Sequence, residues 1–380
     1  MHTKSISLFS GAMGLDIGLI QAGIDIQVGQ DVDNSCIQTM LANGHSCIAG
    51  DIRNISADTI LNEIGLEPGE PFLVCGGPPC QPFSTAGKRL GINDPRGSLF
   101  VDFVRIIEHT RPRFFVMENV KGLMSSMLKD GSGNNTNTKV LDIILKEFNK
   151  LNYKTVYGVL DAVNYGVPQF RERFVLIGSR DGEDIFLPAP THFHVHQNPH
   201  YRWITLDKAI KDIEDSFGEC ASFSDARLNY LKMIPEGGNW RNLPESVVED
   251  AMGGAYKSGG GKVGFYRRLS YSQPSPTLVT SPVQKATMMC HPTKNRPLSV
   301  AEYARIQQFP DDWSFVGSIS EKYKQIGNAV PVGLSRAIGD MLMSVASGEH
   351  EVVVKRTRGT SIHNRIQNAI KLGVLSNVRN

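Results

Sequence analysis

The chain has 380 residues, of which 41% are hydrophobic and 21% charged. Because single cores stop growing near ~250–300 residues, this length predicts two domains. Forty Lys and Arg residues against 38 Asp and Glu residues leave a formal net charge of +2, so no strong global field points to a polyanion, and any such partner has to be met by local patches.

The cysteines and the apolar segments indicate where the protein resides. Six cysteines are scattered without a C-x-x-C pair, which favours free thiols in a reducing compartment over a disulfide framework or a zinc site. No run of 18 apolar residues is present, and the N-terminal apolar stretch is interrupted by Asp16 and lacks a basic lead and a cleavage site. We therefore expect a soluble cytoplasmic protein with no membrane contact.

The first 180 residues alternate short β-rich apolar runs with amphipathic segments, the pattern of a parallel sheet flanked by helices. The pattern predicts strands at residues 5–9, 24–28, 72–75, 114–117, 155–160 and 174–177, with a shorter run at 47–48, and helices at 15–22, 34–42, 98–109 and 139–151. Ligands of open α/β sheets collect at the carboxyl ends of the strands. The residues predicted at those ends are Gly11, Asp31, Asp51, Cys80 and Glu118.

From about residue 181 to 299 the chain is rich in proline, glycine and polar residues, which predicts a separate loop-rich domain or a large insertion. Within it, residues 257–271 interleave four basic and three aromatic side chains with no acid, a composition suited to phosphates and stacked bases. A solvated glycine loop is the alternative. Helices are predicted again at 299–308 and 332–345. The tail from 352 to 380 holds six basic residues and no acidic one; we favour a solubilising end over a phosphate-contacting arm.

Cys80 lies in a loop with an unusual concentration of proline and glycine. Three prolines among positions 78–82 fix φ on both sides of the thiol, and the preceding Gly76 and Gly77 allow another body to approach the backbone. This arrangement indicates a nucleophile held in place. The alternative is a proline-rich loop with an inert buried cysteine.

A second group of residues has the features of a nucleoside site. Residues 9–14 end a strand and open a helix, so backbone N–H groups face a ligand. The glycine spacing departs from G-x-G-x-x-G, which favours a cofactor without a pyrophosphate. Asp31, after the second strand, can accept a ribose hydroxyl pair, and Asp51, after the third, would lie near an adenine amino group. Each acid alone is more often an N-cap, but their common register favours a ligand.

Glu118 closes the apolar run 114–117, so it emerges from a buried strand at the same edge as Cys80. A desolvated carboxyl there stays protonated, or shares a proton, near neutral pH; a helix cap is the alternative. Arg171 and Arg173 alternate along a strand start and point the same way. Such nearby cations favour the thiolate form of Cys80.

These motifs, in this order, resemble the DNA cytosine-C5 methyltransferases over nearly the whole chain. The Cys80 loop and its continuation at residues 94–100 are similar to the nucleophile loop of that family. Residues 118–120, Glu-Asn-Val, are similar to its acidic motif, and residues 169–173, Gln-x-Arg-x-Arg, to its arginine motif. Residues 296–310 and 325–331 are similar to the two closing motifs, and residues 274–278 contain a Thr-Leu step typical of its recognition region.

The resemblance implies an α/β, Rossmann-like S-adenosylmethionine-dependent methyltransferase fold with a smaller, loop-rich target-recognition domain. The catalytic and cofactor-binding domain would comprise residues 1–182 and 320–348, the target-recognition domain 183–319, and a basic tail 349–380. S-adenosyl-L-methionine, leaving as S-adenosyl-L-homocysteine, is the implied cofactor, with no metal. The implied cofactor residues are Phe9, Gly11, Gly14, Asp31, Val32, Asp51, Ile52, Pro79, Leu99, Asn328 and Ala329.

The implied reaction is attack of the Cys80 thiolate on C6 of a flipped cytosine in duplex DNA, with Glu118 at N3 and with Arg171 and Arg173 at O2 and neighbouring phosphates. The implied DNA contacts come from Gln81, Ser84, Lys88, Arg89, Arg96, Arg267, Arg268 and Thr277. We expect a monomer, with a cognate restriction endonuclease for the same site as a candidate partner. A catalytically silent DNA-binding regulator and a tRNA methyltransferase of the same fold are the competing interpretations.

Two positions depart from the family pattern. Met13 stands where the family usually has glycine, which bears on how closely the backbone approaches the methionine portion of the cofactor. Val32 stands where the family often has a large aromatic that stacks on adenine, and there we expect weaker cofactor binding rather than its loss. Histidines at 192, 194, 196 and 200 follow a Pro-Ala-Pro-Thr sequence common in the family. For that reason a metal site is not expected there.

Overall fold

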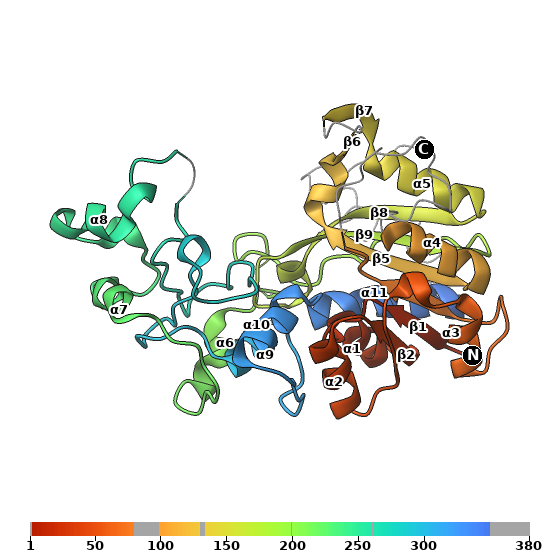
Figure 1. Cartoon of the computed structure of the whole chain (residues 1–380), viewed down its shortest axis with the longest axis horizontal. Coiled ribbons are helices and arrows are strands. Elements are labelled where there is room, and N and C mark those ends of the chain that lie inside the picture. Colours follow the sequence, from red (N-terminus) through yellow and green to blue (C-terminus); the bar gives the residue numbers. More distant parts are fainter. Residues whose placement is uncertain (1, 80–98, 130–133, 199, 260–261, 350–380) are drawn as a thin grey trace.

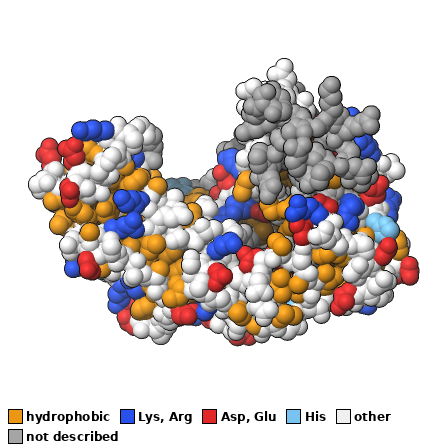
Figure 2. Space-filling model, viewed as in Figure 1, with side chains coloured by type: hydrophobic (Ala, Val, Ile, Leu, Met, Phe, Trp, Pro, Cys, Tyr) orange, Lys and Arg blue, Asp and Glu red, His pale blue; other side chains and the backbone are white. Residues whose placement is uncertain are grey.

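The computed structural model describes residues 2–79, 99–129, 134–198, 200–259 and 262–349. Of the predicted site residues, Cys80, Gln81, Ser84, Lys88, Arg89 and Arg96 lie outside these ranges, as does the tail 350–380. Figure 1 shows two lobes, one built on a large sheet and the other made of short helices and loops. Figure 2 shows a hollow between the lobes, with Lys and Arg side chains around it.

The larger lobe contains a seven-stranded sheet in the order β3-β2-β1-β4-β5-β9-β8. Its strands are β1 (Lys4–Leu8), β2 (Asp25–Asp31), β3 (Cys47–Ala49), β4 (Leu73–Gly76), β5 (Phe114–Val120), β8 (Lys154–Asp161) and β9 (Glu172–Ser179). The first five strands pair in parallel, as predicted. The expectation of a parallel sheet is wrong for β9, which pairs antiparallel with both β5 and β8.

Each face of the sheet is covered by helices, which explains why its central strands are nearly continuous apolar runs. One face packs against α3 (Ala57–Ile64), α4 (Leu99–Thr110) and α5 (Val140–Lys150). The other packs against α1 (Gly14–Gln21) and α11 (Val332–Ser347). Along β4 the side chains alternate between the two cores, with Val74 in the first and Leu73 and Cys75 in the second.

A third core joins the two lobes. It brings together α2 (Asn34–Ala42), α6 (Leu206–Ile210), α9 (Val300–Ile306) and α10 (Ile319–Asn328). The smaller lobe also has a core of its own, to which α7 (Asp225–Leu231) and α8 (Glu245–Met252) contribute. The domain boundaries at residues 183 and 319 stay a prediction. α9 and α10, which lie on either side of the second boundary, pack together in this third core.

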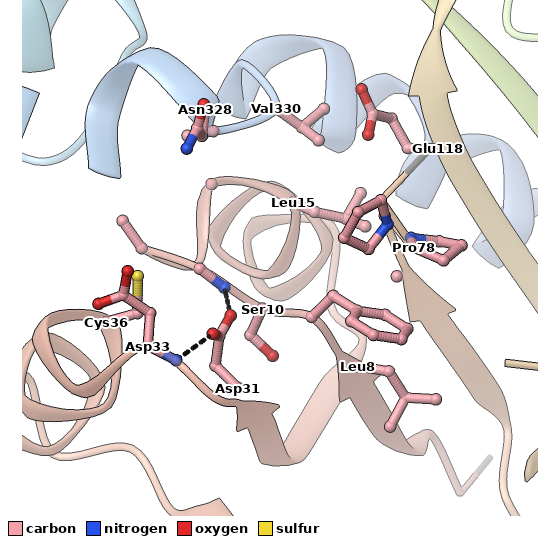
Figure 3. Close-up of a pocket in the computed structure, with 18 of the residues that line it drawn as sticks. Leu8, Ser10, Leu15, Asp31, Asp33, Cys36, Pro78, Glu118, Asn328 and Val330 are labelled. Carbon is pink, nitrogen blue, oxygen red and sulfur yellow. Dashed lines mark hydrogen bonds between the residues drawn. The ribbon is translucent and has the colours of Figure 1, made fainter. Parts of the chain in front are cut away.

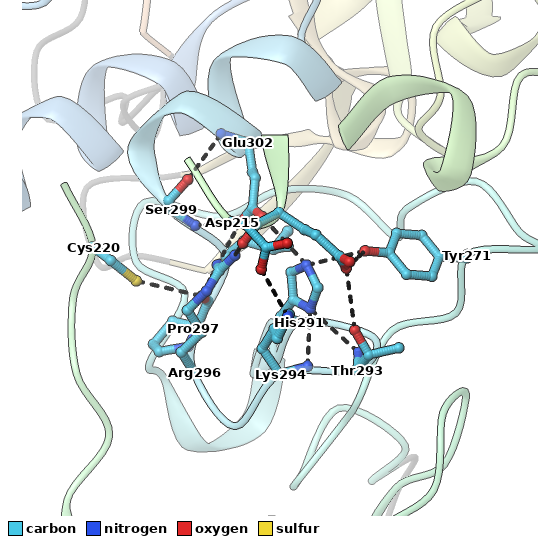
Figure 4. A network of polar contacts seen from close by, with 12 residues as sticks. Asp215, Cys220, Tyr271, His291, Thr293, Lys294, Arg296, Pro297, Ser299 and Glu302 are labelled. Carbon is cyan, nitrogen blue, oxygen red and sulfur yellow. Dashed lines mark hydrogen bonds and ion pairs between the residues drawn. The ribbon is translucent and has the colours of Figure 1, made fainter. Parts of the chain in front are cut away.

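A buried polar network fixes the start of α9 in the smaller lobe (Figure 4). The carboxylate of Glu302 is fully buried and accepts two hydrogen bonds from the guanidinium of Arg296, at 2.7 and 2.8 Å. It also accepts the backbone N–H of Ser299, whose hydroxyl caps the helix in return. His291 Nε2 lies 3.4 Å from the same carboxylate. The buried carboxylate of Glu302 is thus neutralised by Arg296, and the pair holds the loops around α9 in place.

Several elements were not predicted from the sequence. The hairpin β6 (Met127–Lys129) and β7 (Asn135–Lys139) lacks an apolar alternation, because β7 reads Asn-Thr-Asn-Thr-Lys. The predicted helices also do not include α3, α6, α7, α8 and α10. Among the described residues, one stretch, Ile319–Ser347, is long and apolar enough to count as a candidate membrane span. It consists of two helices, α10 and α11, and 56% of the tested window is buried inside the protein.

Candidate active site

A cavity of about 1060 Å³ opens at the carboxyl ends of β1, β2, β4 and β5. Its wall includes Glu118, Arg171 and Arg173 together with the residues predicted to hold a cofactor (Figure 3). The structure thus brings into one wall Phe9, Gly11, Gly14, Asp31, Val32, Asp51, Ile52, Pro79, Leu99, Asn328 and Ala329. Most of these residues lie where strands end at one edge of the sheet. Asn328 and Ala329, more than 300 positions after Phe9, come from the end of α10.

The turn after β1 is shaped by left-handed backbone conformations. Phe9, Gly11 and Met13 have φ values of 56°, 55° and 66°. Gly14 is glycine for another reason: a Cβ there would lie 2.3 Å from the carbonyl oxygen of Val330. This close approach brings the start of α1 against residues 329–330, which line the same cavity.

Met13 keeps the left-handed backbone that glycine adopts at low cost. The strain of such a conformation costs roughly 1–2 kcal/mol for a residue with a Cβ. The Met13 side chain is fully buried in the core that joins the lobes, and burying a methionine contributes about 1.5–3 kcal/mol. Packing therefore offsets the strain, and the side chain points into the core while the backbone forms the turn.

Asp31 organises one side of the cavity through hydrogen bonds to the backbone. Its Oδ2 accepts the backbone N–H of Gly11 at 2.8 Å, and its Oδ1 accepts those of Val32 and Asp33 at 2.7 and 2.8 Å (Figure 3). Each carboxylate oxygen has two lone pairs. In the part of the chain that the structure describes, Oδ2 has one donor and therefore retains capacity to accept a ligand hydroxyl.

Two ion pairs flank Val32 at the mouth of the cavity. Asp51 is hydrogen-bonded to Arg53, which lowers the pKa of that carboxyl. Asp33 accepts Lys324 Nζ at 2.7 Å, a bond that, with further hydrogen bonds from Ser35, lowers the pKa of Asp33 to about 2. Between them the Val32 side chain is 67% exposed. This edge of the cavity consequently has an uncovered apolar surface where a planar ligand could rest.

Glu118 and Arg173 form an ion pair inside the cavity, with Arg173 Nε 2.7 Å from Glu118 Oε1 and both side chains only 12% exposed. Burial raises the pKa of Glu118, and the opposing positive charges of Arg173 and Arg171 do not fully cancel that effect. Gly77 makes room for the carboxyl, because a Cβ there would lie 2.9 Å from Glu118 Oε2. The carboxyl is thus a buried group able to exchange a proton with a ligand nearer to neutral pH than an exposed glutamate.

Arg171 is more buried than the sequence suggested, at 1% exposure. Its Nη1 donates to the carbonyl oxygen of Leu278 at 2.9 Å, and its Nη2 to that of Gly327 at 2.6 Å. Burial lowers the pKa of Arg171 to about 9. The Nε atom has no acceptor among the described residues. A buried donor without a partner is costly, so a ligand acceptor in the cavity would stabilise it.

Asn119 links the Glu118 strand to the loop that leads to Cys80. Its Nδ2 donates to the carbonyl oxygen of Pro78 at 3.0 Å, and the side chain is 8% exposed. Pro79, the next residue, lines the cavity. In the sequence, Asn119 is recognisable only as part of the Glu-Asn-Val motif. Successive side chains of a strand point to opposite faces, so Asn119 was predictable as a side chain on the face of β5 opposite to Glu118.

The proposed DNA contact of Arg268 requires correction. Arg268 is 4% exposed, and each of its five N–H donors is paired within the smaller lobe. The acceptors are the carbonyl oxygens of Ile234, His291, Lys294 and Leu231 and the side chain of Asn295. A phosphate contact would break these bonds, so Arg268 organises loops instead.

The other two described DNA candidates differ from Arg268. Arg267 is half-buried and donates from Nε to the carbonyl oxygen of Met288 at 3.0 Å. Thr277 is exposed, and its hydroxyl donates to the carbonyl oxygen of Phe170 at 2.7 Å. Thr277 is therefore accessible at the surface beside the arginine motif. Among the described residues there is no group of three or more side chains that could hold a metal ion.

The cavity wall also contains residues that were not predicted from the sequence. Arg53 stands two positions after Asp51, and a basic neighbour of a predicted ligand carboxylate could have been noticed. Lys324 lies on α10, a helix that was not predicted, so its position could not be inferred. Ser10 and Val330 lie directly beside predicted residues.

The family of the chain follows from comparison with known proteins. The model of the C-5 cytosine-specific DNA methylase family matches residues 3–344. The chain belongs to this family. Among its relatives, Type II methyltransferase M.PspPI of Psychrobacter sp. is 41% identical over 348 residues, which cover 89% of this chain and 78% of the relative. M.Sau96I of Staphylococcus aureus is 40% identical over 339 residues, covering 88% and 74%.

As a C-5 cytosine-specific DNA methylase, the chain is a DNA (cytosine-5-)-methyltransferase, and the solved structures similar to it share its fold. A DNA modification methyltransferase from an E. coli prophage has a TM-score of 0.64 at 24% identity, with 90% of this chain and 99% of that chain covered. DNMT2 of Spodoptera frugiperda has a TM-score of 0.57 at 18% identity, with 90% and 99% covered. The predicted family and the Rossmann-like methyltransferase fold are confirmed.

Proposed function

We propose that this methylase transfers a methyl group from S-adenosyl-L-methionine to C5 of a cytosine flipped out of a specific duplex sequence, through a covalent bond between Cys80 and C6. The observation that carries the proposal is the Glu118–Arg173 ion pair. It faces the same cavity as Pro79 and as Asp31 and Asp51, the carboxylates predicted to bind the cofactor. Cytosine C5 is a weak nucleophile in the aromatic ring, so the ring has to be activated at C6 first.

The cavity wall has the donors and acceptors that S-adenosylmethionine requires. Asp31 has a free accepting lone pair for the ribose, Asp51 lies near the expected adenine, and Gly11 leaves open space beside the backbone because nothing lies within 4 Å of its ideal Cβ position. Asn328 and Ala329 also line the cavity, and Figure 3 shows Asn328 across the cavity from Asp31. When bound, this cofactor supplies an electrophilic methyl group.

Cys80 and Glu118 would act on opposite parts of the cytosine ring. Addition of the Cys80 thiolate forms the S–C6 bond and shifts the C5–C6 π electrons toward C5, and a proton held by Glu118 at N3 stabilises the charge that develops. C5 would then form a bond to the donated methyl carbon as the bond between that carbon and the sulfonium sulfur breaks, which leaves S-adenosyl-L-homocysteine. Loss of the C5 proton to water, return of the N3 proton to Glu118 and breaking of the S–C6 bond would then restore the aromatic ring and the thiolate. Burial supports this role, because it raises the pKa of Glu118 and favours the proton-bearing form.

Arg173 and Arg171 would orient the base. Arg173 holds the Glu118 carboxyl in place, and the unpaired Nε of Arg171 suits the cytosine O2 acceptor. The target carbon is inaccessible inside a duplex, so the base has to leave the stack to enter the cavity. The hollow between the lobes (Figure 2) is the expected DNA path, and Thr277 is exposed beside the arginine motif.

The biological role we propose is protection of host DNA in the cytoplasm, in step with a restriction endonuclease for the same sequence. It rests on the similarity to proteins that are Type II methyltransferases. A chain encoded without such an endonuclease would contradict this role without affecting the chemistry.

The chemistry is tested by incubating the protein with labelled S-adenosylmethionine and either duplex DNA or tRNA. We expect label at C5 of cytosine in DNA and a covalent adduct on duplexes containing 5-fluorocytosine, because fluorine cannot leave as a proton does. Label in tRNA alone would favour the competing tRNA methyltransferase. An active preparation without the adduct would refute attack by Cys80.

A further inference from the structure

We propose that Gln169 and Gln307 are positioning residues that couple the cofactor cavity to the Thr277–Leu278 step at the DNA-facing surface, so that binding of one ligand strengthens binding of the other. The inference rests on the proposed function for the identity of the two ligands. It adds a physical connection between their sites and assigns it to two buried amide side chains.

The two side chains form a direct hydrogen bond in the interior. Gln169 Nε2 donates to Gln307 Oε1 at 2.9 Å, and both residues are fully buried. They are 138 positions apart in the chain. Gln169 precedes β9, and Gln307 follows α9. The bond therefore joins the sheet lobe to the segment that enters from the smaller lobe.

At one end, Gln307 holds the backbone of the cofactor wall. Its Nε2 donates to the carbonyl oxygens of Ile326 and Ala329, at 2.7 and 3.2 Å. Ala329 lines the cavity and directly follows Asn328, the last residue of α10. A shift of this wall on cofactor binding would therefore act directly on the Gln307 amide.

At the other end, Gln169 holds the Thr277–Leu278 step. Its Oε1 accepts the backbone N–H of Leu278 at 2.8 Å, and Arg171 Nη1 donates to the carbonyl oxygen of the same residue at 2.9 Å. Both backbone groups of Leu278 are thereby fixed. The adjacent Thr277 is exposed, so its position at the surface is set from the interior.

The orientation of both amides is determined by the backbone at the two ends. The carbonyl oxygens near Gln307 require its NH2 group, and the Leu278 N–H requires the oxygen of Gln169. This leaves Gln307 Oε1 facing Gln169 Nε2, which is the bond observed. Neither amide can reverse without facing like atoms in a buried site, where an unpaired polar group costs about 1–3 kcal/mol. The connection is consequently directional and stiff.

The connection is tested by measuring the dissociation constant of S-adenosylhomocysteine with and without duplex DNA. The duplex carries the site found by bisulfite sequencing of DNA that the enzyme has methylated. For the native protein we expect DNA to tighten the product cofactor by roughly 5-fold or more, within the usual range of coupling. Gln169→Met and Gln307→Met should each bring this ratio close to one, and the double variant should lose no more than either single variant.

A matched control is Thr110→Val, which removes a buried hydrogen bond to the carbonyl oxygen of Ile106 at the far end of α4; it should leave the ratio unchanged. If the methionine variants fail to fold, Gln169→Glu is the alternative. It keeps an acceptor for the Leu278 N–H and places an oxygen opposite Gln307 Oε1, so it should bring the ratio of dissociation constants close to one while the protein stays folded. A native ratio of one, or folded variants that keep the native ratio, would overturn the proposal. Failure of the proposed function would instead appear as absence of cytosine labelling in the native protein.

Discussion

Arg173 contacts Glu118 diagonally across two neighbouring antiparallel strands. Arg173 pairs in register with Val120 and Glu118 with Val175, so the two charged side chains lie on the same face two positions apart, with Nε and Oε1 2.7 Å apart. A parallel β9 would have placed its first residues at the opposite edge of the sheet. The reversal of this one strand is what brings the arginine motif to the cavity.

Replacement of Glu118 by glutamine tests the carboxyl directly. The amide keeps the shape but cannot hold the transferable proton, so we expect kcat to fall about 10²–10³-fold, the usual cost of one electrostatic contact to a transition state. The dissociation constant of S-adenosylmethionine should change little. Glu172→Gln, which alters an exposed carboxylate paired with Lys121, is the control and should stay near native activity. Equal losses in the two variants would contradict a specific role for Glu118.

Cys80→Ser should abolish turnover and 5-fluorocytosine trapping and leave the affinity for S-adenosylhomocysteine nearly intact, because a hydroxyl is far less nucleophilic than a thiolate at neutral pH. Titration calorimetry and adduct formation provide the two measurements. Cys220→Ser, at a half-buried thiol in the smaller lobe, is the matched control. A parallel loss of cofactor affinity would indicate that Cys80 is structural.

Val32→Trp should strengthen cofactor binding. The native side chain is 67% exposed at the cavity mouth, and an aromatic ring there can stack on a purine, which contributes about 0.5–1.5 kcal/mol, or roughly 2- to 12-fold in affinity. The dissociation constant of S-adenosylhomocysteine is the measurement. Val195→Trp places the same ring at an exposed position outside the cavity and should have no effect. Unchanged affinity in Val32→Trp would mean that the purine does not rest on this edge.

Asp16 predicts a pH dependence of stability. The carboxyl is fully buried in α1, and burial raises its pKa from 3.8 to about 7. Between about pH 4 and 7 the folded state therefore binds more protons than the unfolded state, so the free energy of unfolding falls as pH rises, by at most about 1.4 kcal/mol per pH unit. Above about pH 7 this contribution is constant.

Asp16→Asn should remove that pH dependence. The difference between the denaturation midpoints of the variant and of the native protein should therefore shift in favour of the variant from pH 5 to pH 8. Glu63→Gln, at an exposed carboxyl of α3, should show no such trend. A gain for Asp16→Asn that is the same at both pH values would show that the Asp16 carboxyl does not titrate in this window.

Arg268→Ala should act through stability. Removing the guanidinium leaves five neutral acceptors of the smaller lobe without their donor. Because each acceptor that stays buried and unpaired costs about 1–3 kcal/mol, we expect a loss of roughly 3 kcal/mol or more. Urea denaturation measures this loss. Arg241→Ala, at an exposed arginine of the same lobe, should cost far less. If Arg268→Ala is as stable as the native protein and its DNA binding depends less on salt, Arg268 contacts a DNA phosphate after all.

The local elements and the chemistry that they carry follow from the sequence. The first five strands are short, and each has a glycine or an acidic residue within it or within three positions after its end: Gly11, Asp31, Asp51, Gly76 and Glu118. Burial on both faces of a sheet favours the apolar residues of these strands. From their common register, Asp31, Asp51 and Glu118 could be assigned to one edge. The ordered motifs then identified the family, because residue types at fixed spacings are a property of the chain alone.

How the arginines are used depends on the fold. Arg171, Arg173 and Arg268 are alike in sequence, but Arg171 joins two backbone segments, Arg173 pairs with the carboxyl of Glu118, and Arg268 donates to the loops of the smaller lobe. Strand direction, loop closure and the pairing of buried donors depend on partners that are distant in the chain. The physical reason is that a guanidinium takes its role from the acceptors around it, and those acceptors come together only when the chain has folded.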